Sequence, residues 1–393
     1  MLNFDYCAPT RFVFGKGSEN EVGATLKPHA SKALLHFGGS NIKKSGLYDR
    51  IVASLNAAGL AFVELGGVKP NPRVSLVREG IGLCKAEGVD LILAVGGGSV
   101  IDSSKAIAMG RYYEGDIWEV YEQGKPVSKA LPVATVLTIP AAGSEASGAS
   151  VISNEEKAMK LGYTSQVLRP LVSFVNPELF FTLPRNQIAN GVSDMMSHVF
   201  ERYFTNTPRT DLTDGLCEAT LRAIMKNALI LMDNPQDYDA WCEIGYSGTV
   251  AHIDMLGMGR EEDWACHDIE HELSAIYDIA HGTGLAVLTP GWMRYVYRDN
   301  IPMFMQFAAN VMDVRLSCRD PEALILEAIS RLGYFFRKIG QPASLSELGI
   351  GSDQFEHMAK KATGIAYGKE ERPVGGLKKL YWQDVAAIYA LVK

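Results

Sequence analysis

The chain has 393 residues, of which 47% are hydrophobic and 21% are charged, and its 38 basic and 45 acidic side chains give a formal net charge of -7. This composition is typical of a globular protein, and the length favours two domains. With a negative net charge and no basic run longer than a pair, the chain lacks the charge pattern that attracts nucleic acids or acidic membranes, so we expect neither as a partner. Asp5 and Arg11 interrupt the stretch that a signal peptide would need to be apolar, and no later segment has about 18 uninterrupted apolar residues. We therefore expect a cytoplasmic protein.

Short apolar runs alternate with amphipathic segments over the first 185 residues. The runs end at turn-forming residues, which is typical of buried strands, and the segments 47–59 and 74–88 between them have helical periodicity. Strands that alternate with helices imply a parallel sheet with helices on both faces. The predicted strands are residues 33–40, 61–67, 91–99, 132–140 and 171–177.

The pattern changes after the segment 176–184, where strand signals largely stop. Long segments with helical periodicity follow, such as residues 211–232 and 321–340. We therefore predict an α/β domain over residues 1–185 and an all-helical domain over residues 186–393.

A glycine-rich turn ends the third predicted strand, where Gly96, Gly97, Gly98 and Ser99 lead into a predicted helix. Glycines at such a turn let backbone N–H groups approach a phosphate, and the helix N-terminus favours its negative charge. The spacing differs from the GxGxxG dinucleotide fingerprint, and a tight turn without a ligand explains the glycines equally well.

A second glycine-rich strand end places Gly38, Gly39 and Ser40 just before Lys43 and Lys44. In nucleotide-binding sheets an acidic residue at such a position holds the ribose 2′-hydroxyl, whereas small and basic residues leave room for a 2′-phosphate. No carboxylate is present here. The alternative is a solvated turn with surface lysines.

The helical half contains two pairs of metal-binding side chains at helical spacing. Asp194 and His198 are four residues apart, as are His267 and His271, and His281 follows ten residues later beside two glycines. Residues four apart share one helix face, so the two members of a pair could bind the same ion. Imidazoles with a carboxylate suit Fe²⁺ or Zn²⁺ better than calcium or magnesium. Ordinary polar helix surface is the alternative.

Two neighbours of this cluster are interpreted as structural. His252 has no partner at a suitable spacing and is interpreted as a helix histidine with its hydrogen bonds satisfied. Cys266 is adjacent to His267, so it points about 100° away on a helix and is expected in the core.

Four motifs in order resemble those of the iron-containing (group III) alcohol dehydrogenase family: GGGSVID, PAAGSEASGASVIS, NPELFFTLPRNQIANGVSDMMSHVFERY and WACHDIEHELSAIYDIAHGTGLAV. The resemblance runs essentially from end to end. Within the family, GGSNIKK and PAAGSEAS resemble the branch of NADPH-dependent butanol dehydrogenases and broad-range aldehyde reductases.

This resemblance implies a dinucleotide-binding α/β domain, an all-helical metal domain and an active site between them. The metal ligands of the family match Asp194, His198, His267 and His281, and its additional histidine near the nicotinamide matches His271. The residues implied to contact the cofactor are Gly96, Gly97, Gly98, Ser99 and Asp102 at the phosphates and Thr138, Ser144 and Lys160 along the pyrophosphate, ribose and nicotinamide, with Lys157 as an alternative to Lys160.

The resemblance further implies reversible hydride transfer between NADP(H) and a small-molecule primary alcohol or aldehyde, with one Fe²⁺ or Zn²⁺ as a Lewis acid. His271 would relay the proton or support the metal site. NAD-preferring members carry an acidic residue where this chain has Gly39, so NADP is favoured. The strand 11–17 resembles family segments that pair across a homodimer. The rival functions are a glycerol-type polyol dehydrogenase or lyase on the same scaffold, and a metal- and nucleotide-binding sensor without turnover.

Overall fold

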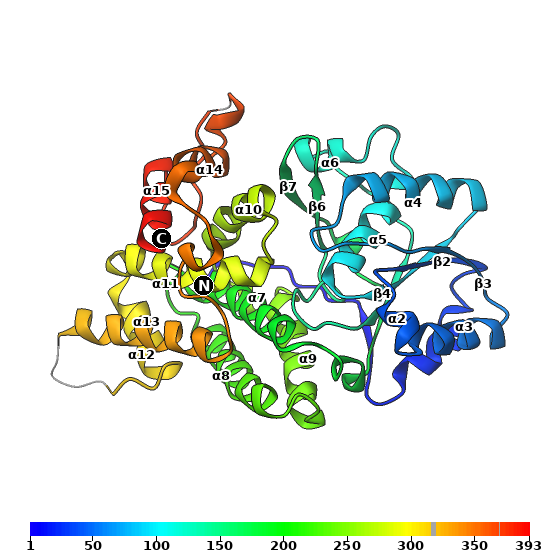
Figure 1. Cartoon of the computed structure of the whole chain (residues 1–393), viewed down its shortest axis with the longest axis horizontal. Helices are drawn as coiled ribbons and strands as arrows, with labels where there is room; N and C mark the ends of the chain where they lie inside the picture. The colour runs from blue at the N-terminus through cyan, green and yellow to red at the C-terminus, as the bar shows by residue number, and fades with distance from the viewer. Residues whose placement is uncertain (316–319, 369) are drawn as a thin grey trace. The chain divides into compact units, whose positions relative to one another are not determined.

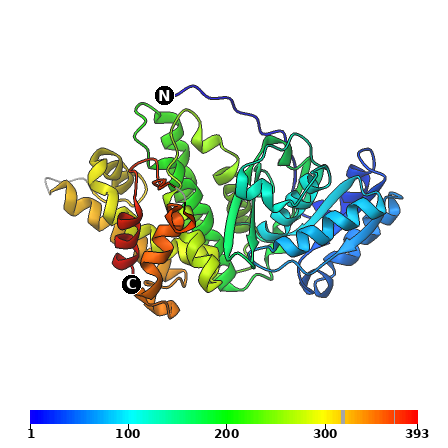
Figure 2. The ribbon, with the colours of Figure 1, turned by 90° about the horizontal axis from the view of Figure 1, so that it is seen from above.

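A computed structural model describes residues 1–315, 320–368 and 370–393. The chain forms two compact units, Cys7–Thr182 and Leu183–Lys393, and the second unit also includes Met1–Tyr6. These first six residues were predicted to lie in the α/β domain, which was predicted to end at residue 185. The segment instead belongs to the helical unit, because the backbone N–H of Leu2 donates to the carbonyl of Gly259 at 2.7 Å. Figure 2 shows this segment as an extended trace.

The first unit contains a six-stranded parallel sheet in the order β1-β8-β5-β4-β2-β3 (Figure 1). This confirms the parallel sheet predicted from the alternating strands and helices. The strands are β1 (Arg11–Phe14), β2 (Lys32–Phe37), β3 (Ala61–Leu65), β4 (Leu91–Gly96), β5 (Val133–Leu137) and β8 (Val172–Val175). The helices of this unit are α1 (Val22–Leu26), α2 (Asn41–Lys44), α3 (Leu47–Ala57), α4 (Val74–Glu87), α5 (Gly98–Gly110) and α6 (Trp118–Gln123).

Side chains of β4 alternate between two apolar cores, one on each face of the sheet. Leu91 and Leu93 pack in a cluster with residues of α1 and α3, whereas Ile92 packs in a cluster with residues of α4, α5 and α6. A strand buried on both faces reads as a continuous apolar run, which is why the sequence identified it.

The order in which the chain adds strands to the sheet reverses between β2 and β4. From β2 the chain adds β3 on one side, and it then returns to the other side of β2 to add β4, β5 and β8 in turn. In open parallel sheets, ligands bind outside the carboxyl ends of the strands at such a reversal point. The segments that follow β2 and β4 therefore form the edge where a ligand is expected.

An antiparallel hairpin, β6 (Ala149–Asn154) with β7 (Met159–Thr164), lies outside the main sheet and was not predicted. It packs against α5 and α6. Its residues complete the core on that face, with Ile152 fully buried.

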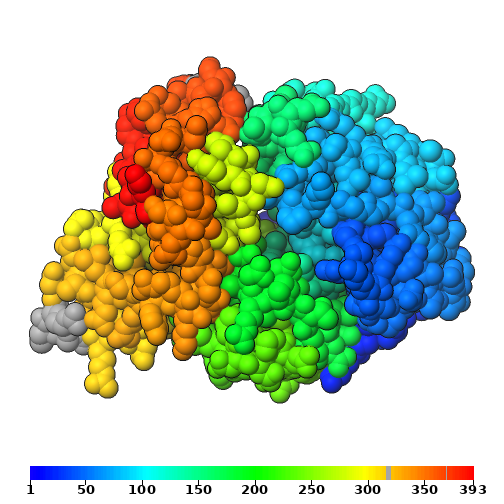
Figure 3. Space-filling model, viewed as in Figure 1, coloured from blue at the N-terminus to red at the C-terminus, as the bar shows by residue number. Residues whose placement is uncertain are grey.

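The second unit is helical, in agreement with the sequence (Figure 1). Helix α7 packs against α8, α9 and α11, and α10 packs against α11 and α14. In the space-filling view the C-terminal segment lies beside α10 (Figure 3). Among the described residues, no helix combines the length and the apolar character needed to span a bilayer. The helices are α7 (Arg185–Tyr203), α8 (Asp211–Asp233), α9 (Tyr238–His252), α10 (Ala265–Tyr277), α11 (His281–Val296), α12 (Ile301–Asn310), α13 (Pro321–Lys338), α14 (Phe355–Ala362) and α15 (Trp382–Leu391).

Candidate active site

Helix α7 carries Asp194 and His198 on one face, one turn apart, and both side chains are buried. The Nε2 atom of His198 lies 3.7 Å from Oδ1 of Asp194. Burial holds the pKa of His198 well below its usual value. The ring is therefore neutral near pH 7, which is the form that binds a metal ion.

Two further imidazoles converge on the same carboxylate oxygen. Nε2 of His267, in the first turn of α10, lies 3.9 Å from Oδ1 of Asp194, and Nε2 of His281, the first residue of α11, lies 3.8 Å from it. The ligand atoms of Asp194, His267 and His281 are all within 4.8 Å of one another. Ligands about 2.1 Å from a tetrahedral ion are about 3.4 Å apart, so the side chains fit one divalent transition metal after a small contraction.

Each of two glutamates holds a histidine that lies on another helix. Oε1 of Glu201, on α7, lies 2.8 Å from Nδ1 of His267 on α10. Glu270, on α10, contacts Nδ1 of His281 on α11 in the same way. A carboxylate on the outer ring nitrogen fixes the orientation of an imidazole and leaves its Nε2 directed at the metal. Glu201 thus links α7 to α10, and Glu270 links α10 to α11.

Neither glutamate was identified from the sequence, although the spacing of each from a candidate ligand was a signal. Glu201 follows His198 by three residues and Glu270 follows His267 by three residues, so each shares a helix face with a candidate ligand. Burial raises the pKa of Glu201 to about 8. A cation bound through His267 would favour the ionised carboxylate.

Two glycines allow α11 to approach α7 and α10 closely. A Cβ atom at Gly282 would lie 2.1 Å from the carbonyl oxygen of Asn190 on α7. A Cβ atom at Gly284 would lie 2.7 Å from both Cγ and Oε1 of Glu270. These positions admit no side chain, which explains the glycines beside His281.

His252 is part of the site's surroundings rather than an isolated helix histidine. Its ring stacks on that of His198 with a centroid distance of 4.1 Å, and the His198 ring stacks on that of His267 at 4.8 Å. The guanidinium of Arg202 lies 3.2 Å from Nδ1 of His252 and donates to the carbonyl of His198 at 3.0 Å. Sequence spacing could not reveal this contact, because α9 and α7 meet only in the folded chain.

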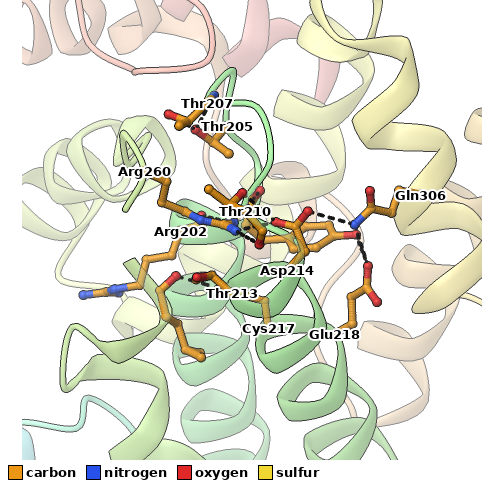
Figure 4. Close-up of polar contacts among 12 residues, drawn as sticks. Arg202, Thr205, Thr207, Thr210, Thr213, Asp214, Cys217, Glu218, Arg260 and Gln306 are labelled. Atoms are coloured by element: carbon orange, nitrogen blue, oxygen red, sulfur yellow. Dashed lines mark hydrogen bonds and ion pairs between the residues drawn. The ribbon is translucent and has the colours of Figure 1, made fainter. Parts of the chain in front are cut away.

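The C-terminal end of α7 is held by a buried polar network (Figure 4). Arg260 donates to the carbonyls of Arg202 and Thr210, each at 3.1 Å, and pairs with the carboxylate of Asp214. Glu218 accepts from the Tyr203 hydroxyl at 2.9 Å and the Gln306 amide at 2.8 Å. The network ties α7 to α8 and α12 and so fixes the helix that carries Asp194 and His198.

His271 lies beside His281. Its ring is half-buried on α10, with its centroid 5.6 Å from that of His281. The four-residue spacing of His267 and His271 therefore brings one ring to the convergence point and leaves the other beside it.

In the α/β unit, the two glycine-rich turns lie at the carboxyl ends of neighbouring strands. Phe37 at the end of β2 is in register with Val95 in β4, and Gly96 is in register with Leu137 at the end of β5. The predicted nucleotide contacts in the following turns therefore share one sheet edge, at the reversal point of the topology. These contacts are Gly38, Gly39, Ser40, Gly96, Gly97, Gly98, Ser99 and Thr138.

The turn after β4 has no room for side chains at two of its glycines. Added Cβ atoms at Gly96 and Gly97 would lie 2.4 Å from Val100 and 2.9 Å from Ile139. Helix α5 begins at Gly98, so its first N–H groups are available at this edge. A backbone cradle at a helix N-terminus fits the phosphates of a dinucleotide.

Asp102 and Ser144 are bonded to each other and to the interior of the unit. Ser144 Oγ donates to the Asp102 carboxylate at 2.5 Å, and the backbone N–H of Val151 donates to the same carboxylate at 2.9 Å. Lys160 on β7 is buried, whereas the ammonium of Lys157 is bound to Glu122 at 2.7 Å. Of the two lysines, Lys160 is therefore the better candidate for a cofactor contact.

The turn after β2 has open space at Gly39 and two lysines beside it. A Cβ atom at Gly39 would meet nothing within 4 Å. The ammonium of Lys43 lies 3.8 Å from the carboxylate of Glu64 and 4.5 Å from the centre of the Tyr48 ring. Lys44 is exposed.

Comparison with known proteins gives one consistent result. Residues 9–177 match the family model "Iron-containing alcohol dehydrogenase", and residues 188–391 match the model "Fe-containing alcohol dehydrogenase family, C-terminal". The chain is 42% identical to NADH-dependent butanol dehydrogenase A of Clostridium acetobutylicum, over 99% of each chain. It is 31% identical to the NADPH-dependent aldehyde reductase YqhD of Escherichia coli, over 92% of this chain and 93% of that protein. The crystal structure of NADH-dependent butanol dehydrogenase A from Thermotoga maritima superposes with a TM-score of 0.95 at 40% identity, covering 100% of this chain and 99% of that one.

Proposed function

The chain belongs to the iron-containing alcohol dehydrogenase family and is an alcohol dehydrogenase or aldehyde reductase, and we propose that it transfers a hydride between NADP(H) and a primary alcohol or its aldehyde. The observation that carries the proposal is the convergence of three imidazole Nε2 atoms on one carboxylate oxygen. This donor set occurs in the same chain as a phosphate cradle at the edge of a parallel sheet.

We propose that Asp194, His198, His267 and His281 hold one Fe²⁺ or Zn²⁺. When bound, such an ion supplies a Lewis acid that lowers the pKa of an alcohol and polarises an aldehyde carbonyl. One carboxylate and three neutral imidazoles would leave a net charge of about +1 at the ion, which would attract the substrate oxygen.

His271 is proposed as the group that moves the proton. Its ring centroid lies 5.6 Å from that of His281. An imidazole titrates near neutral pH and can exchange a proton between an alcohol oxygen and solvent.

For the cofactor, we propose that the turns after β2 and β4 hold the adenosine ribose and the phosphates, and that Thr138, Ser144, Asp102 and Lys160 shape the remaining contacts. The open space at Gly39 and the absence of a carboxylate in residues 38–40 support a 2′-phosphate there. Lys43 and Lys44 are the cations beside this turn, since the ion pair of Lys43 with Glu64 is long, at 3.8 Å, and partly exposed. The relatives described above carry names with either NADH or NADPH, so the choice of NADP rests on this turn.

A homodimer is proposed from the position of β1. This strand is at one edge of the sheet, and Phe12 and Phe14 on it are 39% and 43% exposed. An exposed edge strand with apolar side chains is a pairing surface for a second copy of the chain. Light scattering of the purified protein tests this, and a monomer at micromolar concentration would contradict it.

The decisive experiment combines metal analysis of the purified protein with absorbance of the reduced nicotinamide during reduction of butanal, using NADPH and NADH in turn. We expect one equivalent of iron or zinc per chain and stoichiometric consumption of NADPH. Turnover that survives complete removal of the metal, or protein that binds nucleotide but oxidises none, would overturn the proposal.

A further inference from the structure

The side chain of Lys105 is enclosed in the middle of α5, with no exposed surface. Its ammonium donates to Ser144 Oγ at 2.9 Å, to the carbonyl of Ser147 at 2.8 Å and to the carbonyl of Ala149 at 2.8 Å. An ammonium has three N–H donors, and all three are used here. A buried charge without partners is very unfavourable. The ammonium therefore needs the segment 144–149 in this position, and its three hydrogen bonds hold the segment there.

The same segment is held a second time from α5, one turn earlier. Asp102 accepts from Ser144 Oγ at 2.5 Å and from the backbone N–H of Val151 at 2.9 Å. Ser150 Oγ donates to the Asp102 carbonyl at 2.8 Å. Burial lowers the pKa of Lys105 to about 8, and the opposite charges of Asp102 and Glu145 act against that shift. The ammonium is therefore stabilised by the charges beside it.

The residues just before this segment line the phosphate cradle. A Cβ atom at Gly98, the first residue of α5, would lie 3.0 Å from the Cβ of Ala142. Ile139 lies against Gly97 in the same way, and the N–H of Thr138 donates to the carbonyl of Gly96 at 3.1 Å. The segment 138–149 therefore begins at one side of the cradle and ends at Lys105, which anchors the segment. At that end α5 lies beside β6 (Figure 1).

We propose that Lys105 is a positioning residue for the nucleotide: its ammonium fixes the segment 142–149 against α5 and so gives the cradle its bound shape before the nucleotide arrives. The lysine is buried and acts through the segment, so it need not contact the nucleotide. This inference rests on the proposed nucleotide site at the carboxyl ends of β2 and β4. Preorganisation of a loop improves binding because the cost of ordering it is met during folding.

The test replaces Lys105 by Met, which keeps the length and removes the donors, and measures the Kd of NADPH and NADH from their fluorescence. We expect Lys105→Met to weaken nucleotide binding by about tenfold or more, with metal content unchanged and the KM for butanal within about twofold of wild type. Lys105→Arg, which keeps the charge, should recover part of the loss. Lys32→Met is the matched control, since Lys32 is a partly exposed lysine that pairs with Glu87 at the opposite end of β2, and its Kd should not change.

Hydrogen exchange separates positioning from general destabilisation. In Lys105→Met, exchange should increase at the amides of residues 142–151 and stay slow in β4 and β5. A folded Lys105→Met with wild-type Kd, or an increase of exchange throughout the α/β unit, would overturn the inference. If Lys105→Met does not fold, hydrogen exchange of the wild-type protein without nucleotide replaces this test. Slow exchange at the amides of residues 142–151 is expected, and rapid exchange there would overturn the inference, because the segment would then not be ordered before the nucleotide binds. Failure of the wild-type protein to bind either nucleotide would instead refute the proposed function.

Discussion

One carboxylate oxygen of Glu201 contacts His267 twice: it lies 2.8 Å from Nδ1 of the ring and accepts from the backbone N–H of the same residue at 3.0 Å. The first turn of α10 and the direction of the imidazole are therefore set by a single side chain on α7. Glu201 therefore supports the proposed metal site by orienting His267, although Glu201 is not one of the proposed ligands.

We predict that Glu201→Gln weakens metal binding by about 10- to 100-fold, since an amide is a poorer partner than a carboxylate for the outer nitrogen of a ligand histidine. Metal affinity is measured by competition with a chelator. Glu19→Gln is the control, because Glu19 is also buried but binds Arg50 and Asn176 in the α/β unit. Equal metal affinity in Glu201→Gln and wild type would remove Glu201 from this role.

Substitutions at the two histidines of α10 should separate their roles. His267→Ala removes a proposed ligand, so we expect metal affinity to fall by about tenfold or more and turnover to be lost. His271→Ala should keep the metal and lower kcat or shift its pH profile. Metal analysis and pH–rate profiles on the same preparations check both. Loss of metal from His271→Ala would make His271 a ligand, and normal metal content in His267→Ala would refute the ligand set.

We predict that Gly284→Ala also weakens the metal site, because the new methyl group must displace the Glu270 carboxylate that holds His281. The expected cost to folding is about 1–3 kcal/mol, as for other overpacked positions. Gly333→Ala on α13 is the control: a Cβ there meets nothing within 4 Å, so it should be neutral or stabilising. Thermal unfolding and chelator competition measure the two effects, and unchanged metal affinity in Gly284→Ala would contradict the prediction.

The cofactor prediction concerns the turn after β2. We expect kcat/KM to favour NADPH over NADH by about tenfold, or about 1.4 kcal/mol, and Gly39→Asp to narrow or invert this ratio, because a carboxylate repels the 2′-phosphate. Metal content should not change. Gly82→Asp, on α4, also enters open space and serves as the control for the added charge. Equal efficiency with both cofactors, or no response to Gly39→Asp, would show that this turn does not read the 2′-phosphate.

A buried histidine predicts how stability depends on pH. His36 has no exposed surface, and its ring nitrogens contact the Leu65 carbonyl at 2.7 Å and Ser103 Oγ at 2.9 Å. Because a carbonyl only accepts, Nδ1 carries the proton and Nε2 accepts from the serine. Burial lowers the pKa of His36 from 6.5 to about 4.

The unfolded chain therefore binds one more proton than the folded chain between pH 6.5 and about 4. The contribution of the neutral ring to stability is fully present above pH 6.5 and is lost as the pH falls through this window, by up to about 1.4 kcal/mol per pH unit. Urea unfolding of wild type and His36→Asn at several pH values measures it. The variant should be less stable at pH 7 and lose less stability on acidification, and parallel pH profiles would contradict the prediction.

The sequence predicted those features that depend on local pattern. Each predicted strand contains a strand of the sheet, because a run such as residues 91–96 is buried on both faces and must be apolar throughout. Cys266 is buried, as its position next to His267 indicated. The hairpin of β6 and β7 was missed although residues 159–164 do alternate, with Met159, Leu161 and Tyr163 packed against one apolar core. This strand is short and is paired only with β6, outside the main sheet.

The surroundings of the candidate site were harder to predict because they join different helices. The contact of Glu201 with His267 spans 66 positions, and the stacking of His252 on His198 joins α9 to α7. Helical spacing identifies neighbours on one helix and carries no information about which helices meet. The glycines near His281 were visible in the sequence, but their reason, the carbonyl of Asn190 and the side chain of Glu270, is tertiary.

The grouping of Met1–Tyr6 with the helical unit constrains the order of folding during synthesis. The amino group of Met1 donates to the carbonyl of Pro208, 207 positions later, and at 5–20 residues per second this partner is made roughly 10–40 s afterwards. The whole α/β unit is translated in that interval, and it can fold while these six residues have no surface to bind. Their docking must therefore be a late step. A ribosome-bound chain stopped near residue 220, where the α/β unit has left the ribosomal tunnel and Pro208 has not, should hold a folded α/β unit with its N-terminal segment still open to proteases.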